Sequence, residues 1–193
     1  MEAGLIVLAG AVLLVVVALA IVIGIYNGLV GLRNRVDEAF STMDVYLKRR
    51  YDAIPNLVEI VKGYAAHERD TLERIVRARD MAAKAENLEE RSKGDAMLGD
   101  MLPSIFALAE NYPALKADGA FINLQNQLAD VEKDILQSRK YYNGVVRAMN
   151  TRIETFPTSL LANAMGFRRS AYFMADEIER ENVRMDFSNG KGR

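Results

Sequence analysis

Residues 3–32 carry no charged side chain, and this feature constrains the fold more than any other. Within them, Leu5 to Tyr26 form a run of 22 residues dominated by Leu, Ile, Val and Ala. As a helix, the run is about 33 Å long, enough to cross a hydrocarbon core of about 30 Å. A helix also closes its own backbone hydrogen bonds, as lipid requires. The sequence therefore predicts a transmembrane helix at about residues 5–26, within an N-terminal segment of residues 1–32.

A cleaved signal peptide is the alternative interpretation, because Ala18 and Ala20 form an A-x-A pattern. Signal peptides begin with a basic region, however, and this chain has Glu2 there. The apolar run also continues past the A-x-A pattern through Ile25. We therefore favour a retained membrane anchor.

Three small residues recur at every fourth position of the apolar run: Ala20, Gly24 and Gly28. Small residues at this spacing allow two membrane helices to approach closely, so this face is a candidate for helix packing. Gly and Ala are also common in membrane helices without such a role, and that alternative stays open.

Basic residues flank only the C-terminal side of the run, at Arg33 and Arg35 and then at Lys48, Arg49 and Arg50. The positive-inside rule then places the N-terminus outside and the C-terminal domain in the cytoplasm. The sequence thus predicts a single-pass protein of the bacterial cytoplasmic (inner) membrane, with the lipid bilayer as its first partner.

The remaining composition excludes several function classes. Residues 33–193 hold 25 basic and 25 acidic side chains, a balance that argues against a nucleic-acid binder. The chain has no Cys and one His, so it lacks thiol nucleophiles, disulfides and Cys or His clusters for metals. His67 stands beside Glu68, but adjacent helix positions do not face each other. No phosphate-binding, nucleophile-elbow or zinc-protease motif is present. We expect no catalytic, metal or cofactor site.

After Arg33 the hydrophobic pattern is helical, with no sustained alternation of period two. Apolar stripes at helical spacing run through three stretches: Val36, Phe40, Met43, Leu47, Tyr51, Ile54; Leu57, Val61, Tyr64, Leu72, Ile75, Val76; and Met97, Met101, Ile105, Leu108, Tyr112. The polar residues 86–94 are typical of a loop. Asp52 precedes Pro55 by three residues, which predicts a turn near 52–55, although a kink in one helix is the alternative.

The most regular stripe follows Asp118, a residue suited to an N-cap. Its apolar positions alternate at spacings of three and four, as in a coiled coil or a helical bundle: Phe121, Leu124, Leu128, Val131, Ile135, Ser138, Tyr142, Val145 and Met149. Helices with such stripes must pack on one another. The chain is therefore predicted to be all-α, with an antiparallel four-helix bundle over residues 33–156.

The C-terminal part differs from the bundle in composition. Residues 157–187 are predicted to form a C-terminal helical segment, and the Gly-rich residues 188–193 a disordered tail. Its apolar and basic residues are candidates for a contact with the membrane or with another copy of the chain: Leu160, Leu161, Met165, Phe167, Arg168, Arg169 and Phe173.

The basic triplet Lys48–Arg50 allows two interpretations. It could bind anionic lipid, but Lys48 lies about 22 Å beyond Arg33 along a straight helix, farther than a Debye length of about 8 Å. We favour a structural role in which Arg49 or Arg50 pairs with an acid of a neighbouring helix, beside Asp52 and Pro55.

The chain resembles the LemA family of bacterial membrane proteins, over about residues 5–187. The most specific stretch is LKRRYDAIPNLV, residues 47–58, although Ala53 stands where the family usually has a larger aliphatic residue. Further matches are Val61–Tyr64, Tyr112-Pro113, Tyr142-Asn143, Phe156-Pro157 and Gly166-Phe167. The resemblance implies one N-terminal membrane helix, a four-helix bundle and no established enzyme activity. Relatives include a protein needed for forming magnetosome membranes, which points by analogy to membrane organisation.

Two hypotheses for function follow. The first is a non-enzymatic, membrane-anchored scaffold that forms a homo-oligomer and organises membrane or recruits protein partners. The second is an enzyme or small-molecule sensor with an unrecognised site in the bundle, which a pocket lined by buried polar groups would favour.

Overall fold

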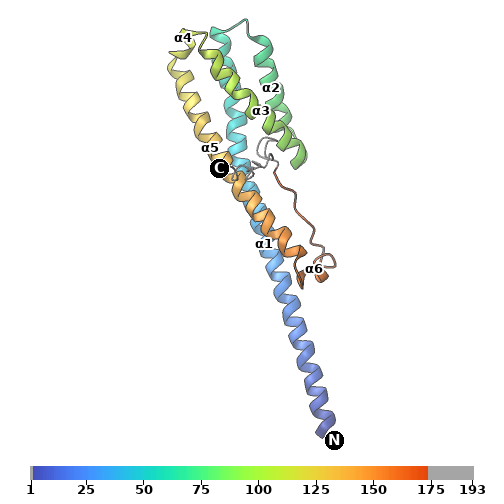
Figure 1. Ribbon diagram of the computed structural model, residues 1–193. Helices are drawn as coiled ribbons and strands as arrows, with labels where there is room; N and C mark the ends of the chain where they lie inside the picture. Colours follow the sequence, from blue (N-terminus) through green and yellow to red (C-terminus); the bar gives the residue numbers. More distant parts are fainter. Residues whose placement is uncertain (1, 174–193) are drawn as a thin grey trace, which may run out of the picture. The chain divides into compact units, whose positions relative to one another are not determined.

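The computed structural model describes residues 2–173, and every regular element within them is a helix (Figure 1). The predicted all-α class is therefore confirmed. The helices are α1 (Glu2–Tyr64), α2 (Arg69–Ala83), α3 (Leu88–Ala109), α4 (Pro113–Lys116), α5 (Gly119–Glu154) and α6 (Thr158–Leu161). The chain divides into two compact units, and these cut across the predicted bundle of residues 33–156. Unit 1 comprises Met1–Arg49 and Ala129–Tyr172; unit 2 comprises Arg50–Leu128 and Phe173–Arg193, of which the last described residue is Phe173.

Helix α1 is one helix of 63 residues that continues through Pro55, so the predicted turn near residues 52–55 is wrong. Proline has no N–H to donate to the carbonyl four residues earlier, here that of Tyr51. Arg79 Nε of α2 donates to that carbonyl instead, at 3.1 Å. Asp52 is exposed inside the helix and caps nothing. The chain turns later, at residues 65–68.

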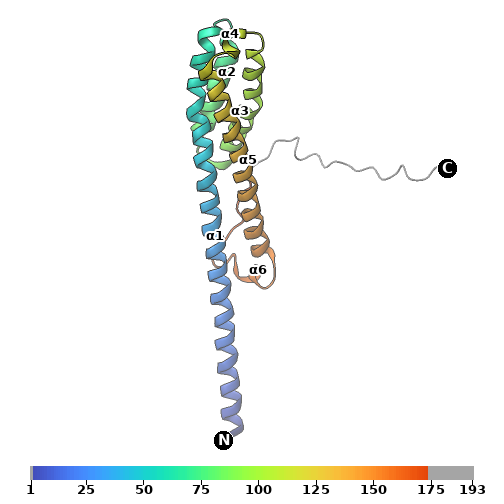
Figure 2. The same cartoon turned by 90° about the vertical axis from the view of Figure 1, so that its left-hand side faces the viewer.

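Unit 2 contains an antiparallel four-helix arrangement. The last turns of α1, then α2, α3 and the first turns of α5 alternate in direction, joined by short connections and by α4 (Figures 1 and 2). Most positions of the predicted stripes face inward and are buried: Ile54, Leu57, Val61, Leu72, Ile75, Ile105, Phe121, Leu124 and Leu128. The predicted stripe of α3 begins one residue out of register, because Leu98 and Leu102 are buried there, whereas Met97 is exposed and Met101 half-buried. Tyr64 and Val76, also predicted to face the core, are exposed. Asp118 caps α5 as expected, since its Oδ1 accepts from the backbone N–H of Phe121 at 2.9 Å.

The expected loop over residues 86–94 is mostly helix, because α3 begins at Leu88. Asn87 caps this helix by accepting a hydrogen bond from the backbone N–H of Glu90 at 2.9 Å. The carboxylates of Glu89 and Glu90 lie in the first turn of α3, where their negative charge interacts favourably with the positive end of the helix dipole. Gly94 is therefore not a loop residue. A Cβ at this position would lie 2.7 Å from backbone atoms of Ala82, so Gly94 permits the close packing of α2 on α3.

In unit 1, α1 and the second part of α5 run antiparallel (Figure 2). Their facing stripes are buried, with Val36, Ala39, Met43 and Leu47 from α1, and Ile135, Tyr142, Val146, Met149 and Ile153 from α5. The rings of Phe40 and Tyr142 meet edge to face at 5.9 Å. The stripe of α5 shifts by one residue here, since Val146 is buried and Val145 only half-buried.

The prediction of a helical segment over residues 157–187 is wrong for most of its described part. Helix α6 has only four residues, and residues 162–173 continue without regular secondary structure. The rest of that segment and the tail of residues 188–193 lie outside the described residues. The non-helical stretch from 162 to 172 is called the C-terminal segment below.

The apolar turns of α1 make up the one stretch of residues 2–173 that is long and apolar enough to cross a membrane, as judged by length and composition. None of the most apolar part of the helix is buried. It is therefore unlike a core helix of a globular domain, whose apolar side chains are covered by neighbouring elements.

Candidate functional site

No chemical centre of the usual kinds is assembled in residues 2–173. No three His, Cys, Asp or Glu side chains are grouped so that they could hold a metal ion. His67 is exposed in the turn before α2. The carboxylate of its neighbour Glu68 accepts a hydrogen bond from the Tyr112 hydroxyl, at 3.3 Å.

The most polar part of the interior is a cluster in unit 2 formed by Arg50, Tyr51 and Asp95. Arg50 is 1% exposed, and its guanidinium forms an ion pair with the Asp95 carboxylate of α3. The same guanidinium donates to the backbone carbonyl of Asp95 at 3.1 Å, and the Tyr51 hydroxyl donates to the carboxylate at 3.3 Å. This is the kind of partner that the sequence indicated for Arg49 or Arg50.

Burial, followed by the nearby charge of Asp95, raises the pKa of Tyr51 well above its ordinary value. Tyr51 therefore stays neutral across the physiological range and serves as a hydrogen-bond donor. The cluster joins α1 to α3 beside the carbonyl that Pro55 leaves without its helical donor. It is enclosed, so its geometry fits a structural role in fixing the register of two helices.

The other members of the basic triplet are exposed and locally paired. Lys48 lies 3.1 Å from Asp44, one helical turn earlier. The Arg49 guanidinium lies over the ring of Tyr46, 5.6 Å from its centroid. Within one sequence triplet, burial thus distinguishes Arg50 from its two neighbours.

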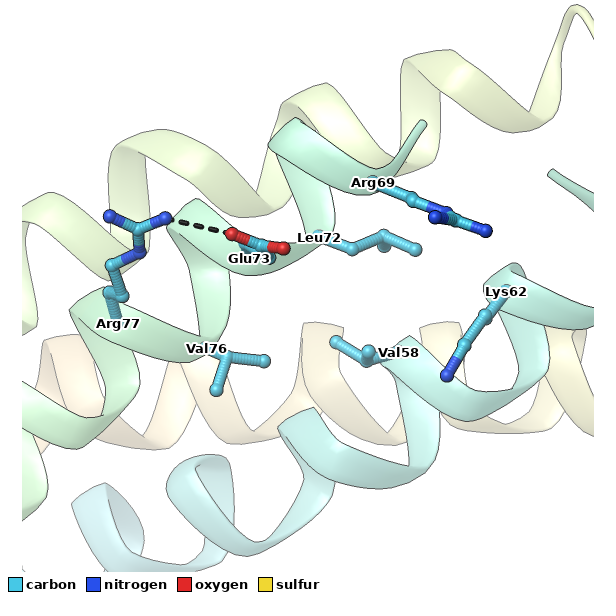
Figure 3. Close-up of a pocket in the computed structure, with 7 residues that line it drawn as sticks. All are labelled: Val58, Lys62, Arg69, Leu72, Glu73, Val76 and Arg77. Atoms are coloured by element: carbon cyan, nitrogen blue, oxygen red, sulfur yellow. Dashed lines mark hydrogen bonds and ion pairs between the residues drawn. The ribbon is translucent and has the colours of Figure 1, made fainter. Parts of the chain in front are cut away.

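A groove of about 470 Å³ lies between the end of α1 and α2 in unit 2. Figure 3 shows the residues that line it. Its apolar wall comes from Val58, Leu72 and Val76, and its rim carries charged side chains, Lys62, Arg69, Glu73 and Arg77. Arg77 forms an ion pair with Glu73 at 2.8 Å. These charged residues are exposed. The groove is therefore not the pocket of convergent buried polar groups that would favour a sensor or an enzyme.

The C-terminal segment is held to α5 by hydrogen bonds between side chains of α5 and the backbone of the segment. Asn150 forms two bonds with Ser170, accepting from its N–H at 2.9 Å and donating to its carbonyl at 3.0 Å. The hydroxyl of Tyr142 donates to the carbonyl of Ala171 at 2.9 Å. Asn150 is one of two buried polar residues of α5, with Ser138, and its amide supplies the bonds that hold the segment.

The same segment also packs on α1. The rings of Phe167 and Tyr26 meet edge to face at 5.8 Å, at the end of the apolar run. Ile25 and Leu29 of α1 are buried, whereas the earlier turns are exposed. In unit 1 the chain therefore returns to the level at which the predicted membrane span ends.

The candidate contact residues of the C-terminal part separate into three groups. Phe167 and Phe173 are buried within the chain, unlike the exposed contact residues that the sequence predicted at these positions. Leu161 and Met165 are half-buried. Leu160, Arg168 and Arg169 are exposed, and Arg169 lies 3.1 Å from Glu154.

The small residues Ala20, Gly24 and Gly28 are exposed, and a Cβ built on either glycine would meet nothing within 4 Å. This face of α1 has the space that close helix packing would need.

Comparison with known proteins places these features in a family. The model of the LemA family matches residues 39–187, which include the Arg50 cluster and the C-terminal segment. The chain belongs to the LemA family.

Proteins similar to this chain come from several bacteria. Protein LemA of Metamycoplasma hominis is 27% identical over 83% of this chain and 74% of the relative. Magnetosome protein MamQ of Magnetospirillum gryphiswaldense is 25% identical over 77% of this chain and 64% of its own length. Magnetosome protein MamQ 2 of Paramagnetospirillum magneticum is 26% identical over 84% of this chain and 69% of the relative.

Proposed function

We propose that this LemA-family chain is a non-enzymatic, single-pass membrane protein that acts as a self-associating scaffold for membrane organisation or partner recruitment. The observation that carries the proposal is the continuity of α1. Its exposed apolar turns continue, without a break in the helix, into turns that pack against α5 in unit 1.

The exposed apolar turns favour a membrane over water. The large Leu, Ile and Val side chains from Leu5 to Ile21 are all at least half exposed, on every side of the helix. Monomeric soluble proteins rarely expose such an extended apolar surface. Burying this surface in lipid is favourable by about 25 cal/mol for each Å² removed from water. The backbone adds no cost, because the hydrogen bonds of α1 are already formed within the helix.

We further propose that the N-terminus lies outside the cytoplasmic (inner) membrane of a bacterium and the rest of the chain in the cytoplasm. The support is the placement of Arg33 and Arg35 directly after the apolar turns, with no basic residue before them.

The scaffold role rests on surfaces rather than on a chemical centre. The interior polar cluster of unit 2 is enclosed, and the groove of Figure 3 has an exposed rim. The open face at Ala20, Gly24 and Gly28 favours association between copies of the chain. The names of the two magnetosome relatives are consistent with a role at a membrane.

The test of self-association is the mass of the full-length protein extracted in detergent, measured across a wide range of concentration. We expect an oligomer that Gly24→Leu dissociates, because the larger side chain blocks close approach of the helices. Ala18→Leu is the matched control, since it lies on a different face of α1 and should leave the mass unchanged.

A monomer at every concentration would refute self-association. Removing residues 158–193 distinguishes the two candidate contacts. If the particle keeps the same number of copies after this truncation, the contact lies in the membrane helix rather than in the C-terminal part.

A further inference from the structure

The turn between α5 and α6 exposes two large apolar side chains. Phe156 is 76% exposed and Leu160 is 70% exposed. Within residues 2–173, these exceed every other large hydrophobic side chain outside the apolar turns of α1. Single exposed apolar residues are ordinary, but two side chains of this size and exposure within one short turn leave apolar surface that water does not favour.

The position of this turn in unit 1 connects it to the predicted membrane span. Helix α5 runs antiparallel to α1 and ends at Glu154, beside the N-terminal half of α1 (Figure 2). A few residues after α6, Phe167 contacts Tyr26, the last residue of the apolar run. The α5–α6 turn therefore lies near the level at which α1 would leave the bilayer.

The elements on both sides of the turn are fixed by contacts within unit 1. On one side of it, α5 is packed against α1 through Met149 and Ile153. On the other, the two hydrogen bonds between Asn150 and Ser170 fix the C-terminal segment.

The charges around the turn favour anionic lipid. Residues 150–173 contain three arginines, at positions 152, 168 and 169, and one carboxylate, Glu154. Arg169 is the partner of Glu154, and Arg152 and Arg168 are exposed. Apolar side chains flanked by exposed cations are the combination by which peripheral segments enter the interface of an anionic membrane.

We propose that the α5–α6 turn is a second membrane contact, in which Phe156 and Leu160 enter the interfacial layer of the bilayer and Arg152 and Arg168 face anionic headgroups. This inference rests on the proposed membrane anchoring by α1. It deepens that proposal, because the chain would then meet the membrane at two points of unit 1. A bilayer suits the site better than a second copy, because the Phe167–Tyr26 contact brings the chain after α6 to the end of the apolar run of α1 and because exposed arginines flank the turn.

The experiment uses the full-length chain in vesicles of phosphatidylcholine and phosphatidylglycerol. The absence of native Cys allows single substitutions Phe156→Cys and Leu160→Cys, each labelled with an environment-sensitive fluorophore. Leu13→Cys, in the centre of the span, is the positive control. Tyr141→Cys is the exposed control, about 22 Å before Phe156 along α5. Quenching by nitroxide on the lipid acyl chains is compared with quenching by aqueous iodide.

We expect lipid quenching at positions 156 and 160 as well as at 13, and iodide quenching alone at 141. Replacing phosphatidylglycerol with phosphatidylcholine should reduce lipid quenching at 156 and 160 but not at 13. If 13 is quenched by lipid while 156 and 160 behave like 141, the turn does not meet the membrane, although the anchor stands. If 156 and 160 are shielded from both quenchers, protein covers them and the inference fails. If 13 itself is not quenched by lipid, the anchor and this inference both fail.

Discussion

Replacing Asp95 by Asn should strongly destabilise unit 2. Asn keeps the shape of the side chain but removes the charge that faces Arg50, which is 1% exposed. An unpaired buried charge is costly, and removing one partner of such a pair typically costs about 3–5 kcal/mol. The bond from Arg50 to the backbone carbonyl of Asp95 persists in the variant and offsets part of this loss, so we expect about 3 kcal/mol.

A loss of this size should be measured easily. At about 2–4 °C per kcal/mol for a chain of this length, 3 kcal/mol lowers Tm by about 6–12 °C. The assay is chemical and thermal unfolding of the detergent-solubilised protein, followed by circular dichroism. Arg50→Ala and Arg49→Ala form a matched pair of adjacent arginines that differ in burial. Replacing the exposed Arg49 by Ala should lower the free energy of unfolding by no more than about 1 kcal/mol, because the contact that is lost is a surface cation–π pair.

The double variant Arg50→Met with Asp95→Leu separates charge from packing. It removes both charges while filling the space, so it should recover most of the loss caused by Asp95→Asn. A single-variant cost as small as that of Arg49→Ala would refute the reasoning, since it would mean that water reaches Arg50 in solution.

Three further predictions concern packing, pH and topology. Gly94→Ala should cost about 1–3 kcal/mol in unfolding experiments, because its Cβ would meet the backbone of Ala82; the same change at the open Gly144 should instead stabilise by up to about 1 kcal/mol. The hydrogen bonds of the α5 cap lower the pKa of Asp118 below its ordinary value of 3.8. The ionised Asp118 therefore stabilises the folded protein above pH 3.8, and this stabilisation is lost as the pH falls through the lower pKa of the folded state. The corresponding fall of Tm at acid pH should be absent in Asp118→Asn. An engineered Glu90→Cys should resist an impermeant thiol reagent in intact cells and react after lysis, and labelling in intact cells would contradict the proposed orientation.

Several helices could be predicted from the sequence because their stripes are local and regular. Met43, Leu47 and Ile54 are buried as their spacing indicated, and Ile135 and Tyr142 likewise face the core. The period of the apolar residues indicates which face of a helix is buried, and in these helices that face does pack against the neighbouring helices.

The corrected features depend on residues distant in sequence. Pro55 favours a break locally, but Arg79 donates to the carbonyl that the proline leaves without its helical donor. Gly94 lies in a polar stretch and resembles a loop residue, yet it is a helix residue at which any side chain would collide with the backbone of Ala82. Neither partner can be identified from spacing along the chain.

The candidate site was harder to predict than the fold, for a similar reason. The sequence marked the apolar residues of the C-terminal part, but it could not show which of them the chain covers itself. Phe167 is covered by contact with Tyr26, whereas Leu160 stays exposed. The bonds of Asn150 to the backbone of Ser170, three residues after Phe167, hold this part of the returning chain against α5, and spacing along the sequence does not reveal them.

The measurement that tests the central claim most directly is the resistance of the protein to extraction from membranes by alkaline carbonate. Carbonate removes peripheral proteins and leaves spanning helices in place. We expect the full-length chain to remain in the membrane pellet and a chain lacking residues 2–32 to be released into the supernatant. Release of the full-length chain by carbonate would contradict anchoring by α1, and so would retention of the shortened chain in the pellet.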